Sequence, residues 1–373
     1  MDKVKNDIRK GEMKVNEYEV IVVGAGPAGC AAAKAAAERG VKTILLEEHA
    51  EIGVPQHCCG AFFSFGVQPA RFKEFVQTLD RRIVLSEYTT RYAYAPSGKV
   101  VHEVSVAGTG ACLVRRNLLD RELAEQAVKV GADLRLNIRV NGLLKQNGRV
   151  IGVTTSSRDI PKVYGKVVIS AEGIHGTQKG IPKSEKLNRS RQAITAGISL
   201  ELTRCRDLEP NVAEMHFGAF CDKGWVTVWP RNHVSCTTQL GSLAEFEKIK
   251  TGNYALSKKL RDAIPLRMVG YSHTADLGQG LPKIVEDGLI LAGSAGGWLG
   301  NWTAIVSGGY AGEVAALAIC EGDVTVKKLS KYEELCKGLR QEGRPFLMAF
   351  RSLSDEAIEN LLPEMIEKGE VLR

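Results

Sequence analysis

The chain has no stretch of about 18 uninterrupted apolar residues, the length that a membrane-spanning helix needs. Residues 1–17 are charged, mixed in sign and without the apolar core of a secretory signal, so we expect a flexible tail. Lys and Arg number 50 against 43 Asp and Glu, and no basic stripe alternates with aromatic residues, which excludes typical nucleic-acid binding. Scattered basic residues indicate solvated surface, with contact to an anionic lipid or a phosphorylated substrate as the alternative.

The cysteines also lack a recognisable pattern. There are nine, an odd number, and none has the CxxC spacing of a zinc site or a built-in iron–sulfur cluster. Without a secretory signal they are expected to be reduced thiols, which favours a cytoplasmic protein and no bound metal. The content of 44% apolar and 25% charged residues is that of a globular protein, and 373 residues suggest two or three domains.

The first chemical signal is a complete strand–turn–helix–strand pattern near the N-terminus. A β-branched run at 19–23 precedes a GxGxxG turn at 24–29, and a helix-forming segment follows at 30–39. A second apolar run, 42–47, ends in Glu47. This pattern predicts a Rossmann-like α/β unit that binds a dinucleotide.

Each residue type in this pattern has a distinct expected role. Gly24 permits the tight turn, Gly26 lets a pyrophosphate approach the backbone, and Gly29 lets helix and strand pack closely. The helix N-terminus offers free N–H groups to phosphate oxygens. Glu47 is expected to accept hydrogen bonds from ribose hydroxyls, and NAD and FAD both satisfy this pattern.

Beyond the first unit the chain changes character. Short alternating runs surround a Pro-Ser-Gly turn at 96–98 and an Asn-Gly turn at 147–148, which predicts β-hairpins inserted into the nucleotide-binding domain. A simple dehydrogenase would continue with further alternating strands and helices. The predicted organisation is a tail (1–17), a discontinuous nucleotide-binding domain (18–80, 105–180 and 275–325), a β-rich substrate domain (81–104 and 181–274) and C-terminal helices (326–373).

Several segments resemble the geranylgeranyl reductase family, within the FAD-dependent, hydroxylase-like flavoprotein oxidoreductases. The resemblance covers about residues 19–320 and rests on the segments 52–61, 114–127, 166–173, 223–230 and 288–297. It implies an FAD-binding fold of the glutathione-reductase type, with an inserted β-sheet substrate domain and a short helical C-terminus. The FAD-binding residues that it implies, together with the glycine turn, are Gly24, Gly26, Pro27, Ala28, Gly29, Glu47, Cys59, Gly60, Ala61, Arg116, Ala171, Gly173, Gly293, Ser294, Gly296 and Gly297.

One of these positions departs from the family. Ser294 stands where the family has an Asp that accepts a hydrogen bond from the ribitol. A hydrogen bond to a charged group contributes about 1.5–3 kcal/mol, against roughly 1 kcal/mol for a neutral one. We therefore expect FAD to be held more weakly, and not lost.

The resemblance also implies a substrate pocket. Alternation along 225–229 places Trp225, Thr227 and Trp229 on one face, and Trp298 is expected to join them, although two tryptophans are equally typical of a sheet core. The implied reaction is hydride transfer from reduced flavin to an isolated C=C bond. Cys59 and His57 are the candidate catalytic residues, with His57 expected to lower the pKa of the thiol; two packed turn thiols are the alternative.

The implied partners follow from this reaction. The substrate would be a polyprenyl lipid or a prenyl diphosphate, and the external electron donor ferredoxin, NADPH or a deazaflavin. The alternatives are a flavin monooxygenase or halogenase that acts on an aromatic substrate, and a quinone- or electron-transferring flavoprotein. Amphipathic segments in 326–373 are expected to dock on the protein's own core, with peripheral membrane or subunit contact as the alternative. The oligomeric state does not follow from these patterns.

Overall fold

A computed structural model describes residues 16–176, 194–274, 283–339 and 349–367. The chain forms two compact units, each built from three segments. Unit 1 contains Met1–Val54, Asp120–Arg191 and Gln279–Arg340, and unit 2 contains Pro55–Leu119, Gln192–Gly278 and Gln341–Arg373.

These units divide the chain at other places than the predicted domains. Residues 55–80 and 105–119 contact unit 2 and not the nucleotide-binding unit, and the C-terminal part is shared between the units instead of forming its own layer. Most of the predicted tail lies outside the described residues, and its last two residues form strand β1 (Asn16–Glu17).

Unit 1 is built on a six-stranded sheet with the order β19-β20-β13-β2-β3-β9. Its strands are β2 (Val20–Val23), β3 (Thr43–Leu46), β9 (Asp133–Arg135), β13 (Val167–Ser170), β19 (Val285–Glu286) and β20 (Leu289–Leu291). All neighbours are parallel except β19 and β20. Every residue of β2, β3 and β13 is buried, which is why these strands appear as continuous apolar runs.

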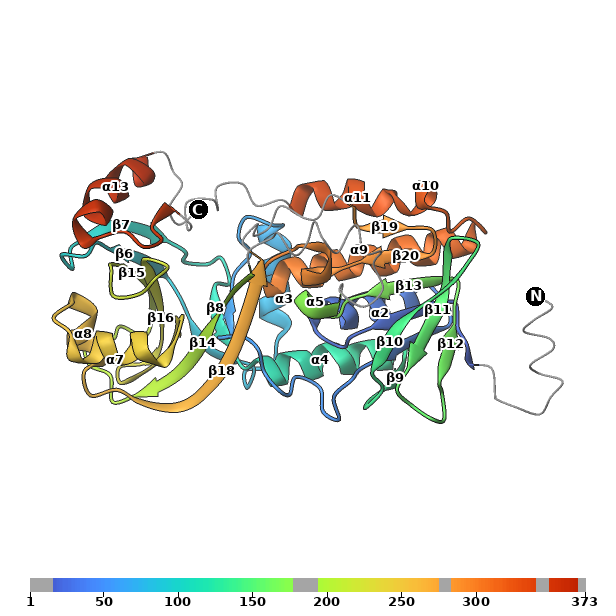
Figure 1. The fold of residues 1–373 in the computed structure, drawn as a ribbon, viewed down its shortest axis with the longest axis horizontal. Helices are drawn as coiled ribbons and strands as arrows, with labels where there is room; N and C mark the ends of the chain where they lie inside the picture. The colour runs from blue at the N-terminus through green and yellow to red at the C-terminus, as the bar shows by residue number, and fades with distance from the viewer. Residues whose placement is uncertain (1–15, 177–193, 275–282, 340–348, 368–373) are drawn as a thin grey trace. The chain divides into compact units, whose positions relative to one another are not determined.

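The helices α2 (Pro27–Ala37) and α9 (Asn301–Cys320) pack against each other beside this sheet (Figure 1). Their backbones nearly touch, because a Cβ atom on Gly308 would lie 2.0 Å from the Ala28 carbonyl oxygen. Among the described helices, α9 alone is long and apolar enough to cross a membrane, but two thirds of that stretch is buried. It is therefore placed here as a core helix.

Shorter elements complete unit 1. The helices α10 (Val326–Leu329) and α11 (Lys331–Cys336) pack on α9, and the Tyr332 hydroxyl donates to the Leu291 carbonyl at 3.0 Å. A second sheet has the order β1-β12-β11-β10. Its strands β10 (Val140–Gln146) and β11 (Arg149–Thr155) form the predicted Asn-Gly hairpin, with β12 (Lys162–Tyr164) beside β11.

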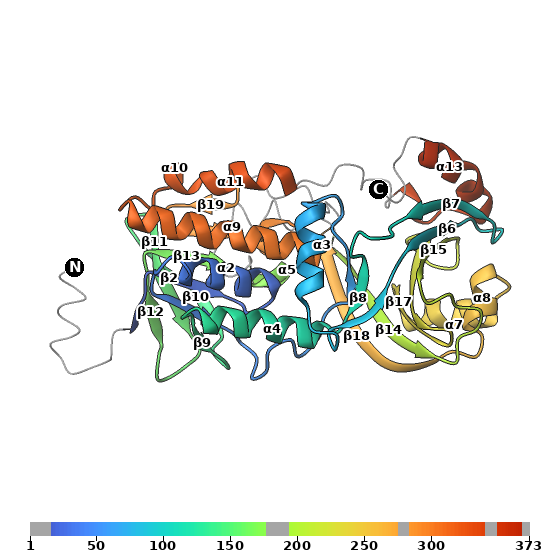
Figure 2. The same cartoon turned by 180° about the vertical axis from the view of Figure 1, so that it is seen from behind.

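Unit 2 is built on a seven-stranded sheet with the order β18-β14-β17-β16-β15-β6-β7. Its strands are β6 (Thr90–Tyr94), β7 (Val100–Ser105), β14 (Ile194–Thr203), β15 (Val212–Phe217), β16 (Trp225–Asn232), β17 (Ser235–Leu240) and β18 (Ile264–Thr274). Helices α7 (Leu243–Thr251) and α8 (Ala255–Leu260) cover one face, and α13 (Asp355–Glu367) packs on the other (Figure 2).

A small sheet with the order β4-β8-β5 completes unit 2. It contains β4 (Ala61–Phe62), β5 (Val84–Glu87) and β8 (Cys112–Val114), and α3 (Pro69–Thr78) packs on it through the Phe62 and Phe72 rings, 5.0 Å apart. Helix α4 (Arg116–Lys129) starts in unit 2 and continues into unit 1, so it is one of the places where the chain passes between the units.

Two neighbouring glycines of α9 test the close packing on α2. Gly308→Ala should lower the free energy of unfolding by about 1–3 kcal/mol, because its Cβ would overlap the Ala28 carbonyl. Gly309→Ala is the matched control: no atom lies within 4 Å of its Cβ, so helix propensity should raise stability by about 0.5–1 kcal/mol. Urea denaturation of both variants measures the difference, and equal effects would contradict this packing.

Candidate active site

The glycine turn after β2 has the geometry that a nucleotide-binding loop needs. Gly24 has φ +92°, and a Cβ there would lie 2.7 Å from the Ala171 carbonyl oxygen. A Cβ on Gly29 would lie 1.7 Å from the Gly24 carbonyl oxygen, so both positions require glycine. No atom lies within 4 Å of a Cβ placed on Gly26, at the start of α2. This open space beside a helix N-terminus suits a pyrophosphate group.

Glu47 is tied to the same turn. One carboxylate oxygen accepts the Ala25 N–H at 2.7 Å, and the other lies 2.6 Å from His49 Nδ1 and accepts the His49 N–H at 3.0 Å. The expected role, ribose binding, considers only the ligand. The structure adds a second role, because this carboxylate holds the loop in place while retaining lone pairs for further hydrogen bonds. Sequence reasoning missed His49.

The remaining predicted FAD contacts of unit 1 gather at the ends of β13 and β20. The N–H of Ala171 donates to Val23 at 2.8 Å, and Gly173 has φ +70°. Gly293 has φ +60° and donates its N–H to the Ser307 hydroxyl at 3.1 Å. Parallel strands bring their carboxyl ends to one edge of the sheet, so these segments lie near the glycine turn.

The other residues predicted here fall into two groups. Pro27 is the first residue of α2, and the buried Ala28 packs against Gly293, whose Cβ would lie 2.7 Å from that of Ala28. Ser294 is exposed within the short turn 293–296, which ends at Gly297 with φ +83°. A Cβ on Gly296 would overlap the Leu291 carbonyl oxygen at 2.6 Å. An open glycine at a helix start, an acid at the end of β3 and an exposed hydroxyl together fit FAD.

Trp298 differs from its prediction. Its side chain is buried in unit 1 next to Gly296, whereas the other three predicted pocket residues belong to unit 2. The structure therefore gives it a place in the core behind the 293–297 turn. The physical reason is that the turn folds back, since the Trp298 N–H donates to the Gly293 carbonyl at 3.1 Å.

In unit 2 the segment 59–61 is pinned to β8. Gly60 has φ +92°, and a Cβ there would lie 2.3 Å from the Val114 carbonyl oxygen. The Val114 N–H donates to the Gly60 carbonyl at 2.8 Å, and Ala61 begins β4. Arg116, two residues beyond β8, is buried and acts electrostatically on the Cys59 thiol. The predicted cofactor residues of unit 2 are thus gathered in one place.

The chemistry of Cys59 differs from the expectation. The hydrogen bond with Cys58 and burial raise the pKa of the Cys59 thiol well above its ordinary value, although Arg116 and the Ala61 N–H oppose this. His57 is exposed and does not contribute to the shift, so the expected lowering by His57 is wrong. No disulfide joins the two cysteines. At neutral pH Cys59 is therefore a protonated thiol, which can donate a proton.

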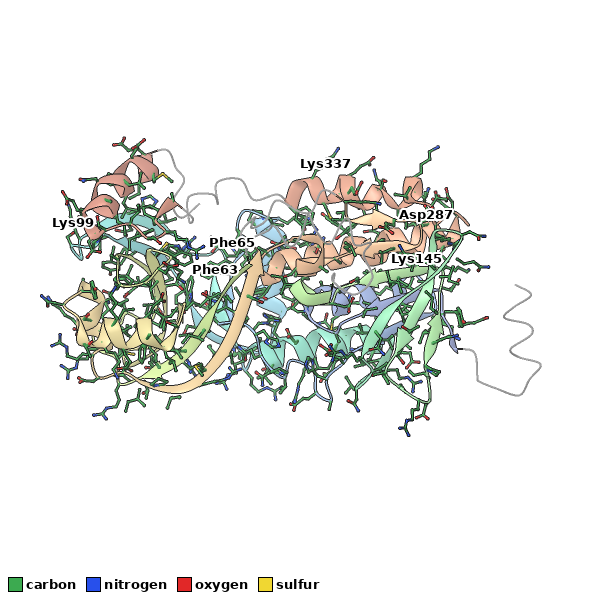
Figure 3. All side chains as sticks on the ribbon, in the orientation of Figure 1. Phe63, Phe65, Lys99, Lys145, Asp287 and Lys337 are labelled. Carbon is green, nitrogen blue, oxygen red and sulfur yellow. The ribbon has the colours of Figure 1, made fainter. Side chains whose placement is uncertain are left out.

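An aromatic group surrounds this thiol and was not anticipated from sequence. Phe63 lies 5.1 Å from Trp229 and stacks on Tyr88 at 6.2 Å between ring centroids, and Cys59 packs against the same cluster. Figure 3 labels Phe63 together with Phe65, whose ring centroid lies 5.9 Å from it. The signal available was the Phe-Phe-Ser-Phe run directly after Gly60.

The β16 strand confirms the expected alternation. Val226 and Val228 point into the core under α7 and α8, while Trp225 and Trp229 pack in two other clusters on the opposite side. Within the described residues, Thr227 Oγ1 and Trp229 Nε1 are buried and have no hydrogen-bond partner. Buried polar atoms are rarely left unpaired, so these two atoms mark a place where a bound group can supply the partners.

Lys223 is a second group that sequence reasoning missed. Its Nζ lies 4.0 Å from the centre of the Trp225 ring and donates to the Gln239 carbonyl at 3.2 Å. Part of the side chain touches solvent, but the ammonium end is deep, and desolvation lowers its pKa to about 8. The thiols of Cys59 and Cys221 act on it electrostatically. A cation thus lies among the predicted pocket residues.

Comparison with known proteins places this geometry in context. A family model described as an FAD binding domain matches residues 17–264. The digeranylgeranylglycerophospholipid reductase of Methanocella arvoryzae is 32% identical over 341 residues, which cover 85% of this chain and 82% of that protein.

Solved structures agree with this match. A geranylgeranyl bacteriochlorophyll reductase-like protein from Thermoplasma acidophilum has a TM-score of 0.81 at 25% identity, over 95% of this chain and 92% of that one. The halogenase PltM in complex with FAD has a TM-score of 0.67 at 16% identity, over 96% of this chain and 87% of that one, and this distant likeness concerns the fold alone.

The exposed serine of the 293–297 turn gives a direct test of cofactor binding. Ser294→Asp should lower the Kd for FAD by about 2- to 30-fold, because a carboxylate is a stronger acceptor than a hydroxyl. Ser294→Ala is the control and should raise the Kd. Fluorescence titration with FAD measures both, and an unchanged Kd in Ser294→Asp would contradict a contact between this residue and FAD.

The buried ammonium group gives a prediction for stability. The pKa of Lys223 is about 8 in the folded protein against 10.5 for a free lysine, so the folded state loses the proton first as pH rises. Lys223→Met should therefore raise the melting temperature at pH 7, and this gain should shrink between pH 8 and 10.5. The exposed Lys99→Met, at a position labelled in Figure 3, is the control and should show no such trend. Thermal unfolding at pH 7 and 9.5 measures it; a pH-independent gain would contradict burial of the charge.

Proposed function

This chain belongs to the digeranylgeranylglycerophospholipid reductase family of FAD-binding proteins, and from this premise we propose that it saturates isolated C=C bonds in the prenyl chains of a glycerophospholipid. It is an FAD-dependent oxidoreductase. Unit 1 supplies the cradle for the dinucleotide, and unit 2 supplies the proton donor and an apolar wall. The observation that carries the proposal is the protonated Cys59 thiol within an aromatic cluster.

The proposed reaction needs both a hydride and a proton. Reduced FAD, when bound, supplies the hydride. An isolated alkene is a poor hydride acceptor, so an acid must protonate the other carbon as the hydride arrives. Cys59 Sγ holds that proton, because its hydrogen bond with Cys58 and its burial disfavour the thiolate.

The charges around Cys59 support this step. After the proton leaves, the sulfur carries a negative charge, which Arg116 and Lys223 stabilise electrostatically. Arg116 is buried on the segment that follows β8, and Lys223 lies over the Trp225 ring. A proton from solvent or from the Lys223 ammonium then restores the thiol, so the residues return to their starting state.

The aromatic group suits a polyprenyl chain. Phe63, Tyr88 and Trp229 present ring surfaces that contact one another at 5.1–6.2 Å between centroids. Such a wall binds apolar chains and excludes water from the reacting carbons. The Tyr88 hydroxyl donates to the Pro230 carbonyl at 2.9 Å, which orients that ring.

The electron donor is external in this proposal. The sequence contains no second GxGxxG for a separate nicotinamide domain, and ferredoxin, NADPH and a deazaflavin are the candidate donors. Each is tested by anaerobic mixing with the FAD-loaded protein, where bleaching of the flavin absorbance identifies the donor that reduces it.

The first experiment is an absorbance spectrum of the purified protein, followed by anaerobic dithionite reduction and addition of digeranylgeranylglycerophospholipid in detergent. Reoxidation of the flavin with a mass gain of two hydrogens per bond supports the proposal. A flavin that is reduced but ignores the lipid points to electron transfer or monooxygenation. A protein that takes up no FAD overturns the proposal.

The adjacent cysteines allow a matched test of the proton donor. Cys59→Ala should slow lipid-driven flavin reoxidation by about 10²- to 10⁴-fold, the usual contribution of general acid catalysis. Reduction by dithionite should stay unchanged, because the thiol takes no part in it. Cys58→Ala keeps the Cys59 thiol and should retain most of the rate. Stopped-flow absorbance measures all three proteins, and equal losses in the two variants would contradict the assignment of Cys59.

A further inference from the structure

Strand β18 exposes apolar side chains at the edge of the seven-stranded sheet of unit 2. Ile264, Leu266 and Met268 are 44%, 65% and 54% exposed. Pro265 pairs with Leu202 and Arg267 with Glu201, so Leu266 is left out of the register. This bulge explains why Leu266, the most exposed of the three, has no partner residue on β14.

A fourth apolar residue lies at the same end of the sheet. Val234, in the turn between β16 and β17, is 53% exposed. Its carbonyl accepts the Cys205 N–H at 2.9 Å, and Thr203, two residues earlier, pairs with Ile264. Val234, Ile264, Leu266 and Met268 therefore form one surface, called the apolar end below. Contiguous apolar surface on a folded protein commonly marks an interaction site.

Basic residues surround the apolar end. The three segments that build it, 203–207, 231–235 and 258–268, contain seven Lys or Arg and two acidic residues. Arg206 is neutralised by Asp262, and Arg231 and Arg267 share Glu201. Another three basic residues of these segments are exposed: Arg204, Lys258 and Arg261.

The edge itself disfavours a protein strand as the partner. An added strand needs a continuous row of free N–H and C=O groups. Pro265 has no N–H, and the bulge at Leu266 interrupts the spacing of the others. Apolar side chains with a basic surround instead match a bilayer, whose acyl region takes the side chains and whose anionic headgroups attract Lys and Arg.

We propose that the apolar end docks unit 2 on an anionic lipid bilayer. Leu266 and Met268 enter the interface between headgroups and acyl chains, and Arg204, Lys258 and Arg261 contact lipid phosphates. The contact is peripheral and weakens with salt, because exposed charges are screened. This inference rests on surface chemistry alone and does not depend on the proposed reaction.

Co-sedimentation of the full chain with vesicles tests the proposal. Binding should be strong with vesicles of phosphatidylcholine and phosphatidylglycerol and weak with phosphatidylcholine alone. Leu266→Glu with Met268→Glu should lower the partition coefficient by more than tenfold. Arg204→Gln and Arg261→Gln should each lower it by about fivefold and reduce its salt dependence.

Leu243→Glu is the matched control. Leu243 is 47% exposed in the same unit but follows β17 at the end where Leu240 pairs with Ile198, away from Leu202 and Cys236. It should leave vesicle binding unchanged. Turnover of detergent-solubilised lipid should stay unchanged in all these variants, so failure of docking and failure of the proposed reaction give different results.

Two outcomes would overturn the proposal. One is equal vesicle binding by the wild type and the Leu266→Glu, Met268→Glu variant. The other is a change in oligomeric state of that variant in light scattering without vesicles, which would show that the apolar end contacts a second copy of the chain. Circular dichroism of each variant checks that the fold is intact.

Discussion

Close contact between backbones organises unit 1. The turn after β2 touches β13 through Gly24, and the start of α2 touches that turn through Gly29 and α9 through Gly308. No side chain fits at these three points, so the strands, α2 and α9 hold one another at a fixed distance. The same contacts leave Gly26 open at the helix start and set Glu47 beside the turn. The cradle for the dinucleotide is thus a consequence of how the core packs.

Unit 2 solves a different problem, that of keeping a proton on a buried thiol. Burial and Cys58 favour the neutral form of Cys59, whereas Arg116 favours the thiolate. Lys223 is subject to the same conflict, because desolvation lowers its pKa while nearby thiols raise it. These opposing effects make the pair suited to proton transfer, since neither protonation state of either group is strongly excluded.

Local patterns were informative where chemistry and backbone geometry act over a few residues. The glycine turn, the buried strands of unit 1 and the Asn-Gly hairpin have the predicted positions because each depends on its own neighbours in the chain. The division into units was harder to predict. Residues 55–80 follow a nucleotide-binding strand in the chain but pack in unit 2, and only contacts distant in sequence decide that.

The sequence by itself determined the dinucleotide fold, the likeness to an FAD-dependent reductase family and the position of Cys59, because these depend on residue type and spacing. Tertiary structure alone decided the protonation of that thiol, the aromatic wall around it, the burial of Trp298 and the charge at Lys223. The physical reason is that a pKa or a packed wall depends on which groups surround an atom. Those neighbours, such as Arg116 for Cys59 and Gln239 for Lys223, come from other strands and loops.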